Sequence, residues 1–406
     1  MPAQTTVESP QRPAGLSRLP ASVLPLIFFS LGHFCVDLYS SALGVLQPLL
    51  IDKFHTNFTQ AGLLGGTLVF ASSVMQPVYG YLSDRFRSRL FTALAPAVAG
   101  VFIAGLGWAP SYGGLLLMVA LGGTGIAAFH PQAAASATVG IETKRGRAMA
   151  VFITTGTLGF ALGPTFFSLV TGRWGLEKAI WGAIPGLVMT VLMMSFRSRI
   201  PTPSNPPARF DWSPLKAVWR PMTILYFLVF IRSVVQITFA QFLPLYLHLQ
   251  RGYSLPKASY IVSLYLVAGA FGGFAGGSLS DRIGGRRVII LSMAGSLPFL
   301  AVFLFFKGPL SIACLWLGGL ALLFTIPVNV VMAQELLPAH AGTISALMMG
   351  FAWGMAGIIF IPLVGWISDV LSLQHAMAGL IAAPVLGFLL ALKLPKTFPN
   401  SAVSHA

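Results

Sequence analysis

Long apolar runs separated by short polar segments occupy most of the sequence. The hydrocarbon core of a bilayer is roughly 30 Å thick, and an α-helix crosses it in about 20 residues. No water is present there to satisfy backbone N–H and C=O groups, so helices are the default spanning element. The short alternating segments typical of transmembrane strands are not evident. We therefore expect twelve spanning helices, at residues 21–51, 58–82, 90–109, 112–139, 148–171, 178–196, 219–249, 255–280, 288–307, 309–334, 342–371 and 373–394.

The composition agrees with a chain that faces lipid. Of the 406 residues, 56% are hydrophobic and 9% are charged, against roughly 25% charged in an ordinary soluble domain. The first apolar run is too long for the core of a signal peptide and contains Asp37, so we expect it to remain as the first helix. Both cysteines fall within predicted spans and indicate no disulfide framework.

The net charge of +15 is explained by topology. A basic chain can indicate a nucleic-acid partner, but here the distribution of Lys and Arg decides. With the N-terminus inside, only six of the 25 basic residues fall in outward loops, and Arg232 falls within a span. This excess of basic residues inside predicts cytoplasmic termini. We expect a multi-pass protein of the cell (inner or plasma) membrane, with the lipid bilayer and no nucleic acid as partner.

The sequence contains a duplication. The segment GYLSDRFRSR at Gly80–Arg89 recurs 197 positions later as GSLSDRIGGR at Gly277–Arg286, with six of ten residues identical. An offset that spans an even number of helices gives two parallel six-helix halves related by an axis along the membrane normal. The predicted organisation is a disordered cytoplasmic tail, an N-terminal half, a proline-rich cytoplasmic linker, a C-terminal half and a cytoplasmic tail, at residues 1–20, 21–196, 197–218, 219–394 and 395–406.

With this doubled loop the chain resembles the major facilitator superfamily, which implies an all-α integral membrane protein of twelve helices in two parallel six-helix pseudo-repeats. The resemblance implies that the loop residues latch the cytoplasmic side closed when the central cavity faces outward, an Asp accepting N–H groups at a neighbouring helix N-terminus. The alternative is that they are merely charged inward loops. The residues concerned are Gly80, Asp84, Arg85, Arg89, Gly277, Asp281, Arg282 and Arg286.

A narrower resemblance is to the fosmidomycin-resistance branch of the superfamily. It is carried by the segment AFHPQA at Ala128–Ala133, by Arg147 with the Ala-Met that follows, and by a glycine pattern in the fifth span. Proteins of that branch are described as proton-coupled exporters of small drugs and related anionic compounds, and they carry Glu where this chain has Gln132. The small residues of the fifth span also permit close helix packing in lipid; they are Gly156, Gly159, Gly163 and Pro164.

Several polar side chains lie within the predicted spans, where a charge costs about 2.5–3.5 kcal/mol on insertion scales. His33 and Asp37 are four residues apart on one face of the first span, and Arg232 and Gln236 are spaced likewise in the seventh. The resemblance implies that the first, fourth, seventh and tenth helices line a central cavity. Polar residues on these helices could then form one cluster at similar depth. The candidate substrate-binding or proton-coupling residues are therefore His33, Asp37, His130, Gln132, Arg232, Gln236 and Asn329.

Two interpretations of these residues remain open. Asp37 could carry a proton, because burial and a nearby cation act in opposite directions on a carboxylate's affinity for protons, while Arg232 binds an anionic group of the substrate. Alternatively, Asp37 and Arg232 form a static ion pair between helices. His130, which precedes Pro131, either contacts substrate or satisfies carbonyls that the proline frees.

The sequence favours a proton-coupled antiporter that exports a small anionic or amphiphilic compound by alternating access. Import of an organic anion by symport or exchange is the alternative, and a structural or receptor role would leave the paired loops unexplained. An intramembrane enzyme is a remote alternative, since no His-Glu-x-x-His or comparable site occurs. No ATP-binding loop is present. We expect a monomer with no catalytic residues, no cofactor and no metal.

Overall fold

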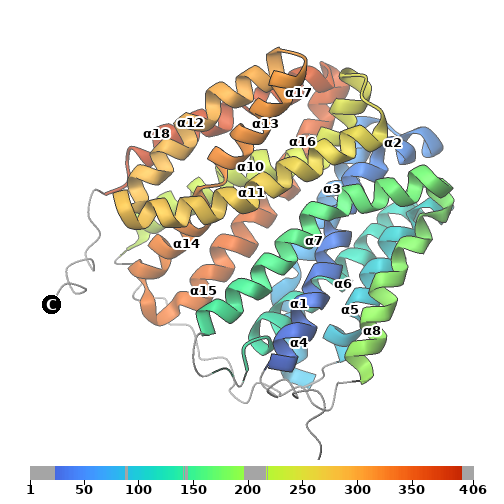
Figure 1. The fold of residues 1–406 in the computed structure, drawn as a ribbon, viewed down its shortest axis with the longest axis horizontal. Coiled ribbons are helices and arrows are strands. Elements are labelled where there is room, and N and C mark those ends of the chain that lie inside the picture. Colours follow the sequence, from blue (N-terminus) through green and yellow to red (C-terminus); the bar gives the residue numbers. More distant parts are fainter. Residues whose placement is uncertain are drawn as a thin grey trace, which may run out of the picture.

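Twelve helical segments of the computed structural model are long and apolar enough to cross a membrane (Figure 1). The structure describes residues 23–86, 90–139, 141, 145–195, 216 and 218–395. The predicted tails and the predicted linker lie almost entirely outside these residues, so their boundaries stay predictions. The twelve segments confirm the predicted spans with small changes at their ends, and run over Val23–Phe54, Phe58–Leu82, Leu90–Trp108, Tyr112–Ser136, Arg147–Trp174, Leu176–Ser195, Trp219–Gln250, Leu255–Ile283, Gly285–Phe305, Pro309–Leu336, Thr343–Val370 and Leu373–Ala391.

In the first half of the chain, most spans consist of more than one helical element. The first span is interrupted at Ser41, and a π-helical turn interrupts the second. The elements are α1 (Val23–Ser40), α2 (Ala42–Phe54), α3 (Phe58–Val69), η1 (Phe70–Val74), α4 (Gln76–Phe86), α5 (Leu90–Ala104), η2 (Gly105–Trp108), α6 (Tyr112–Ser136), α7 (Arg145–Trp174), η3 (Leu176–Ala183) and α8 (Ile184–Ser195).

The second half repeats this arrangement, again with π-helical turns in its first and fifth spans. Its elements are α10 (Trp219–Leu245), η5 (Tyr246–Gln250), α11 (Leu255–Ile283), α12 (Gly285–Phe305), α13 (Pro309–Leu322), α14 (Thr325–Leu336), η6 (Pro338–His340), α15 (Ala341–Ser345), η7 (Ala346–Ala352), α16 (Trp353–Val370), α17 (Leu373–Gly379) and α18 (Ala382–Ala391).

Buried apolar side chains form two clusters, one for each half. The first contains only residues between Phe29 and Met193. The second contains residues between Met222 and Leu394, joined by Val69 and Ala161 from the first half. Each half therefore has an apolar core of its own, as expected for two modules that move against each other.

The two halves contact each other closely near the end predicted to be extracellular. There α3 packs against α16 and α2 packs against α10. Glycines allow the backbones to touch: a Cβ on Gly62 would lie 2.7 Å from the carbonyl oxygen of Ile361, and one on Gly44 or Gly365 would collide with backbone atoms of the opposite half. These contacts hold the halves together at this end.

A carboxylate from the second half caps a helix of the first half at the same end. Asp369, near the end of α16, accepts hydrogen bonds from the backbone N–H of Phe58 (3.0 Å) and of Thr59 (2.7 Å). The hydroxyl of Thr59 donates a further bond to it (2.6 Å). Because α3 begins at Phe58, the charge lies at the positive end of that helix. This bond set, which we call the Asp369 cap, joins the halves through polar contacts.

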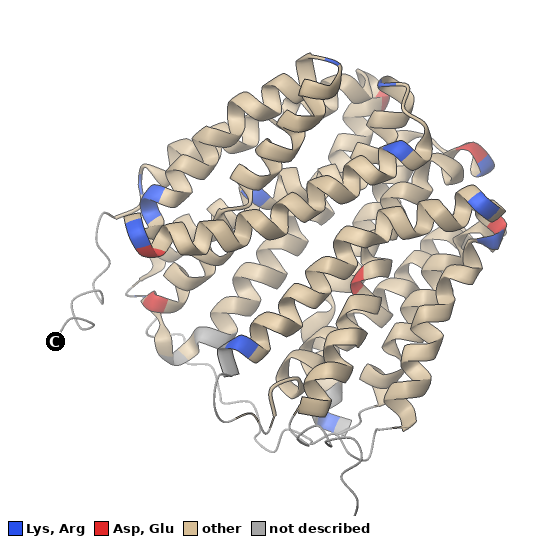
Figure 2. Ribbon diagram, viewed as in Figure 1, with Lys and Arg blue, Asp and Glu red and all other residues tan. Residues whose placement is uncertain are grey.

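α7 and α11 also pack against each other across the two halves, and Figure 1 shows them diverging toward the end predicted to be cytoplasmic. Near their meeting point the hydroxyl of Thr165 hydrogen-bonds that of Ser263 at 2.8 Å. Figure 2 shows charged residues gathered at the two ends of the helices and few along their middle.

Candidate functional site

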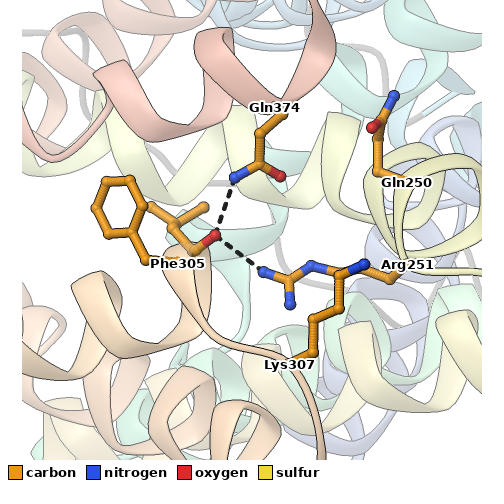
Figure 3. Close-up of a pocket in the computed structure, with 6 residues that line it drawn as sticks. Gln250, Arg251, Phe305, Lys307 and Gln374 are labelled. Atoms are coloured by element: carbon orange, nitrogen blue, oxygen red, sulfur yellow. Dashed lines mark hydrogen bonds between the residues drawn. The ribbon is translucent and has the colours of Figure 1, made fainter.

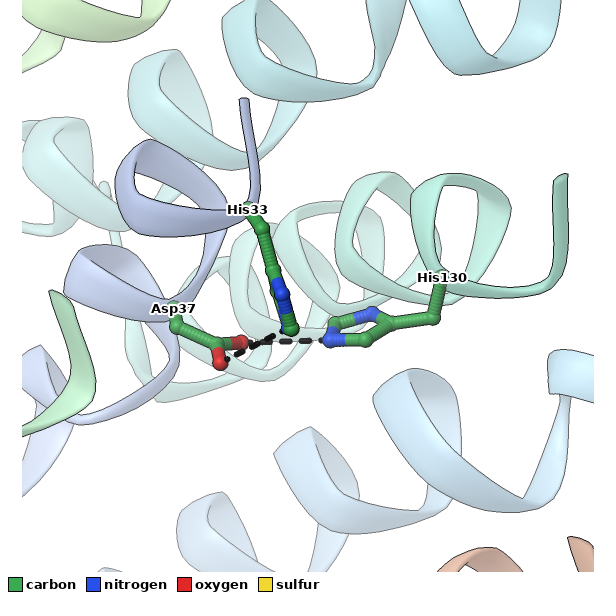
Figure 4. A group of neighbouring side chains, drawn as sticks. All are labelled: His33, Asp37 and His130. Atoms are coloured by element: carbon green, nitrogen blue, oxygen red, sulfur yellow. Dashed lines mark hydrogen bonds and ion pairs between the residues drawn. The ribbon is translucent and has the colours of Figure 1, made fainter. Parts of the chain in front are cut away.

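Three ionisable side chains meet at mid-depth in the first half (Figure 4). His33 and Asp37 extend from α1, and His130 extends from α6. Nε2 of His33 lies 3.2 Å from Oδ2 of Asp37, and Nε2 of His130 lies 3.2 Å from Oδ1 of the same carboxylate. The sequence predicted that His33 and Asp37 share a face, and the packing of α6 on α1 adds His130. We call these three residues the His–Asp–His cluster.

Backbone carbonyls fix both imidazole rings from the opposite side. Nδ1 of His33 lies 2.9 Å from the carbonyl oxygen of Phe152 on α7, and Nδ1 of His130 lies 2.8 Å from that of Ile126 on its own helix. A carbonyl oxygen can only accept, so Nδ1 is the donor in both rings. The carbonyl that His130 bonds is that of Ile126, whereas the one that Pro131 frees is that of Ala127, so the predicted bond to a freed carbonyl is not seen among the described residues. The other ring nitrogen of His130 faces Asp37.

Packing restricts the His33 ring further. It stacks on Phe152 with ring centroids 4.3 Å apart. On another side lies Gly156 of α7, where an added Cβ would collide with the imidazole. Gly159 and Gly163 lie in the same way against the backbone of α1. The fifth-span glycines thus bring α7 close to α1 and leave His33 little room to move.

The His–Asp–His cluster is buried but not sealed by protein. The side chains of His33, Asp37 and His130 are 10%, 16% and 23% exposed. Among the described residues, the two histidines are the ionisable groups that interact with Asp37. One ligand atom from each residue lies within 4.8 Å of the others, so the three could share a metal ion; protons can occupy the same contacts.

In the second half, Arg232 on α10 is the corresponding buried charge. It is 5% exposed, and its Nη1 donates to Oε1 of Gln236 one helical turn away. Within the described part of the chain, its Nε has no hydrogen-bond partner. The side chain of Tyr265 on α11 lies in its vicinity, and the buried hydroxyl of Tyr265 likewise has no hydrogen-bond partner among the described residues. The sequence analysis did not identify Tyr265, because a tyrosine in a span carries no distinguishing pattern.

The structure contradicts one alternative from the sequence. No salt bridge joins Asp37 to Arg232, both of which are described; Asp37 pairs with the two histidines of its own half instead. The static ion pair between the two is therefore wrong in this conformation, and the expected single polar cluster is divided between the halves. No salt bridge joins Arg232 to an acidic side chain among the described residues.

The remaining polar candidates lie apart from these groups. Oε1 of Gln132 accepts a hydrogen bond from Thr92 of α5. Asn329 on α14 is fully buried, and neither atom of its amide has a hydrogen-bond partner among the described residues. Unpaired buried polar atoms are costly, so Asn329 stays a candidate for contact with a ligand.

The predicted gating loops are described only in part. Arg89 and the side chain of Asp84 lie outside the described residues, and Nη1 of Arg85 is 3.4 Å from the hydroxyl of Tyr81. The glycines of the two loops have matching positions, since a Cβ on Gly80 would lie 3.6 Å from Pro131 and one on Gly277 would lie 3.7 Å from Pro327.

In the second copy of the loop, Asp281 and Arg282 are exposed. Arg286 is tied to its own half, because its guanidinium donates to the carbonyls of Leu392 (3.0 Å) and Leu394 (2.9 Å) beyond the end of α18. The latch roles stay predictions.

A second polar junction lies at the outer end of the second half (Figure 3). It borders a pocket of about 220 Å³. Arg251 donates to the hydroxyl of Tyr246 and to the carbonyls of Phe303 and Leu304, where α12 ends. Gln374 donates to the Leu304 carbonyl as well. Since carbonyls and a tyrosine occupy the guanidinium, this junction joins helices and is not a free anion site.

Comparison with known proteins identifies the family to which this architecture belongs. A model of the Major Facilitator Superfamily matches residues 29–360 and, in a second match, 257–404. The chain belongs to the major facilitator superfamily. An uncharacterised transporter of this type from Bacillus subtilis, YfnC, is 32% identical over 381 residues, covering 91% of this chain and 92% of its own. The fosmidomycin resistance protein of Escherichia coli is 29% identical over 372 residues, covering 89% and 90%.

The fold agrees with this membership. The crystal structure of a bacterial homologue of the human lysosomal transporter Spinster, in an inward-facing and occupied conformation, superposes with a TM-score of 0.80. It is 14% identical and covers 94% of this chain and 98% of its own. This major facilitator protein is therefore a multi-pass transporter of the cell membrane with a small-molecule substrate, and its fold and relatives are those of transporters, not of enzymes.

Proposed function

We propose that this transporter is a proton-coupled antiporter that exports a small anionic or amphiphilic compound by alternating access, acting as a monomer. The observation that carries the proposal is the His–Asp–His cluster, which places three titratable side chains within hydrogen-bond distance at mid-depth. Ionisable groups at that depth are costly and are retained for ion or proton pathways. Export is the direction suggested by a relative named for fosmidomycin resistance.

Arg232 supports an anionic substrate. The residue is 5% exposed, and the structure describes no acidic partner for it. A buried charge without a partner is strongly destabilising. A carboxylate or phosphonate group of the substrate would supply two oxygen acceptors for the planar guanidinium, with the hydroxyl of Tyr265 as a further donor. In this arrangement the second half binds the anionic substrate through Arg232, and the first half binds the proton.

The coupling role of Asp37 is tested in proteoliposomes with the variant Asp37→Asn. The variant is expected to lose accumulation of fosmidomycin against its gradient while it still exchanges fosmidomycin across the membrane, because the amide cannot titrate. The control is Asp52→Asn, which removes an exposed carboxylate at the end of α2 and is expected to transport like the parent. Proton-driven accumulation at the parental level in Asp37→Asn would show that the Asp37 carboxylate is not needed for coupling.

Direction is tested in cells. Export predicts that expression of the transporter raises the concentration of fosmidomycin needed to stop growth, whereas import predicts higher intracellular accumulation and greater sensitivity. Inverted membrane vesicles separate the two without growth effects, since an exporter takes up its substrate into them when their interior is acidic.

A further inference from the structure

Both imidazoles of the His–Asp–His cluster present the same nitrogen to one carboxylate. Nδ1 of each ring carries its hydrogen toward a backbone carbonyl, so a neutral ring has only a lone pair left at Nε2. Each Nε2 lies 3.2 Å from a different oxygen of Asp37. A lone pair that faces a carboxylate oxygen at this distance is repulsive, and one proton between the two atoms turns the contact into a hydrogen bond.

The number of protons that the His–Asp–His cluster can hold follows from counting the hydrogens in these contacts. Two Nε2–oxygen contacts need two protons beyond those on the Nδ1 atoms. With both present the cluster carries a charge of +1, with one it is neutral, and with none it is −1 and has two repulsive contacts. The count does not depend on whether a given proton resides on nitrogen or oxygen.

Among the described residues, no neighbouring charge provides a different way to satisfy the cluster. α7, α6, α5, α8 and α2 pack against α1. α5 and α8 contain no ionisable side chain. The ionisable residues of α7 are near its two ends, that of α6 besides His130 is at its first residue, and those of α2 are at its last turn; they are Arg145, Arg147, Arg173, Tyr112, Asp52 and Lys53. On α1 itself, Tyr39 bonds Gly182 and Gly186, and Cys35 faces Pro185, all at α8 or just before it.

We propose that the His–Asp–His cluster is a two-proton site, in which Nε2 of His33 and Nε2 of His130 each share one proton with the carboxylate of Asp37. The inference deepens the proposed function and rests on it for the use of these protons in transport. It assigns a coupling proton to each histidine, so that Asp37 is the common acceptor and not the only carrier.

Nuclear magnetic resonance of the purified transporter with ¹⁵N-labelled histidine tests the count, in the presence of EDTA to remove metal ions. Single variants His33→Gln and His130→Gln assign the two rings among the seven histidines of the chain. The expected result is that both rings keep Nδ1–H throughout a pH titration and that Nε2 is the position that loses its proton in each, giving two protons per chain. In Asp37→Asn the two titrations are expected to become independent.

Two outcomes would overturn the inference. One is a neutral ring in the Nε2–H form, since the carbonyl contacts would then not fix the tautomer. The other is a single titrating Nε2, with the second ring neutral across the range. A variant that fails to fold is recognised by its melting temperature and elution volume, and the parent spectrum alone then decides the count. Two protons in the spectrum but no proton-driven transport in vesicles would refute the proposed function and leave the two-proton site intact.

Discussion

The Asp369 cap should shift the conformational equilibrium toward the state that is closed at the outer end. Alternating access requires the halves to separate at their outer ends, and Asp369 holds them there through bonds to the first two residues of α3. Asp369→Asn keeps the shape of the side chain but removes its charge and one of its two acceptor oxygens. In the conformation that is open at the outer end the cap is broken, so the substitution should leave the free energy of that conformation unchanged.

The size of the effect follows from helix capping. Removal of a capping side chain costs about 0.5–2 kcal/mol, and Asp369 is exposed, which places its contribution toward the middle of that range. Asn57, whose side chain accepts from Gln60, caps the same helix and remains in the variant. We therefore expect a loss of about 1 kcal/mol, which is about a fivefold shift of the equilibrium toward the outward-open state.

Distances between two spin labels, measured by double electron–electron resonance, report this shift. Trp108 and Leu310 are suitable label sites, because they are 62% and 70% exposed at the outer ends of the two halves. The native cysteines, Cys35 and Cys314, are replaced by alanine first. In Asp369→Asn the longer-distance population is expected to increase about fivefold relative to the shorter one, and Asp52→Asn serves as the control. Identical distributions in Asp369→Asn and the parent would refute the view that this cap holds the halves together.

Three further variants test other contacts. Gly156→Ala places a methyl group against the ring of His33 and is expected to lower the free energy of unfolding by about 1–3 kcal/mol and to reduce proton-driven transport. The control is Gly172→Ala, where nothing lies within 4 Å of the added methyl group, and it is expected to change neither. Under the proposed function, fosmidomycin at about 100 times its Kd should stabilise the parent by about 2.7 kcal/mol, seen as a higher melting temperature, and this shift should vanish in Arg232→Ala. Arg251→Ala removes the bonds to the end of α12 and should lower stability by about 1–2 kcal/mol, measured as a lower melting temperature, with transport retained.

The sequence predicted the membrane spans well because their signal is local. A run of apolar residues of bilayer length has one structural solution in lipid, and the repeated loop revealed the internal duplication. The pairing of His33 with Asp37 could also be predicted from the sequence, since residues four apart on a helix share a face.

The contacts between helices were harder to predict. That His130 joins Asp37, while Arg232 turns toward its own half, depends on how α6 and α10 are rotated, and a nearly uniformly apolar helix carries little information about its rotation. The static pairing of Asp37 with Arg232 was one of two interpretations that the sequence left open, and this structure does not contain it, because the two histidines occupy the carboxylate. Asp369 was missed because an acid at the end of a span resembles any other charged loop residue until its partner helix is known.

α7 connects the His–Asp–His cluster mechanically to the opposite half. Its residue Phe152 accepts from His33, and 13 residues along, about 20 Å at the rise of a helix, Thr165 bonds Ser263 of α11. Movement of the second half can therefore pull on the carbonyl that orients His33. The acceptor for His130 belongs to its own helix and moves with it. The two histidines thus differ in what orients them: the acceptor for His33 lies on a helix that contacts the opposite half, and the acceptor for His130 lies on its own helix.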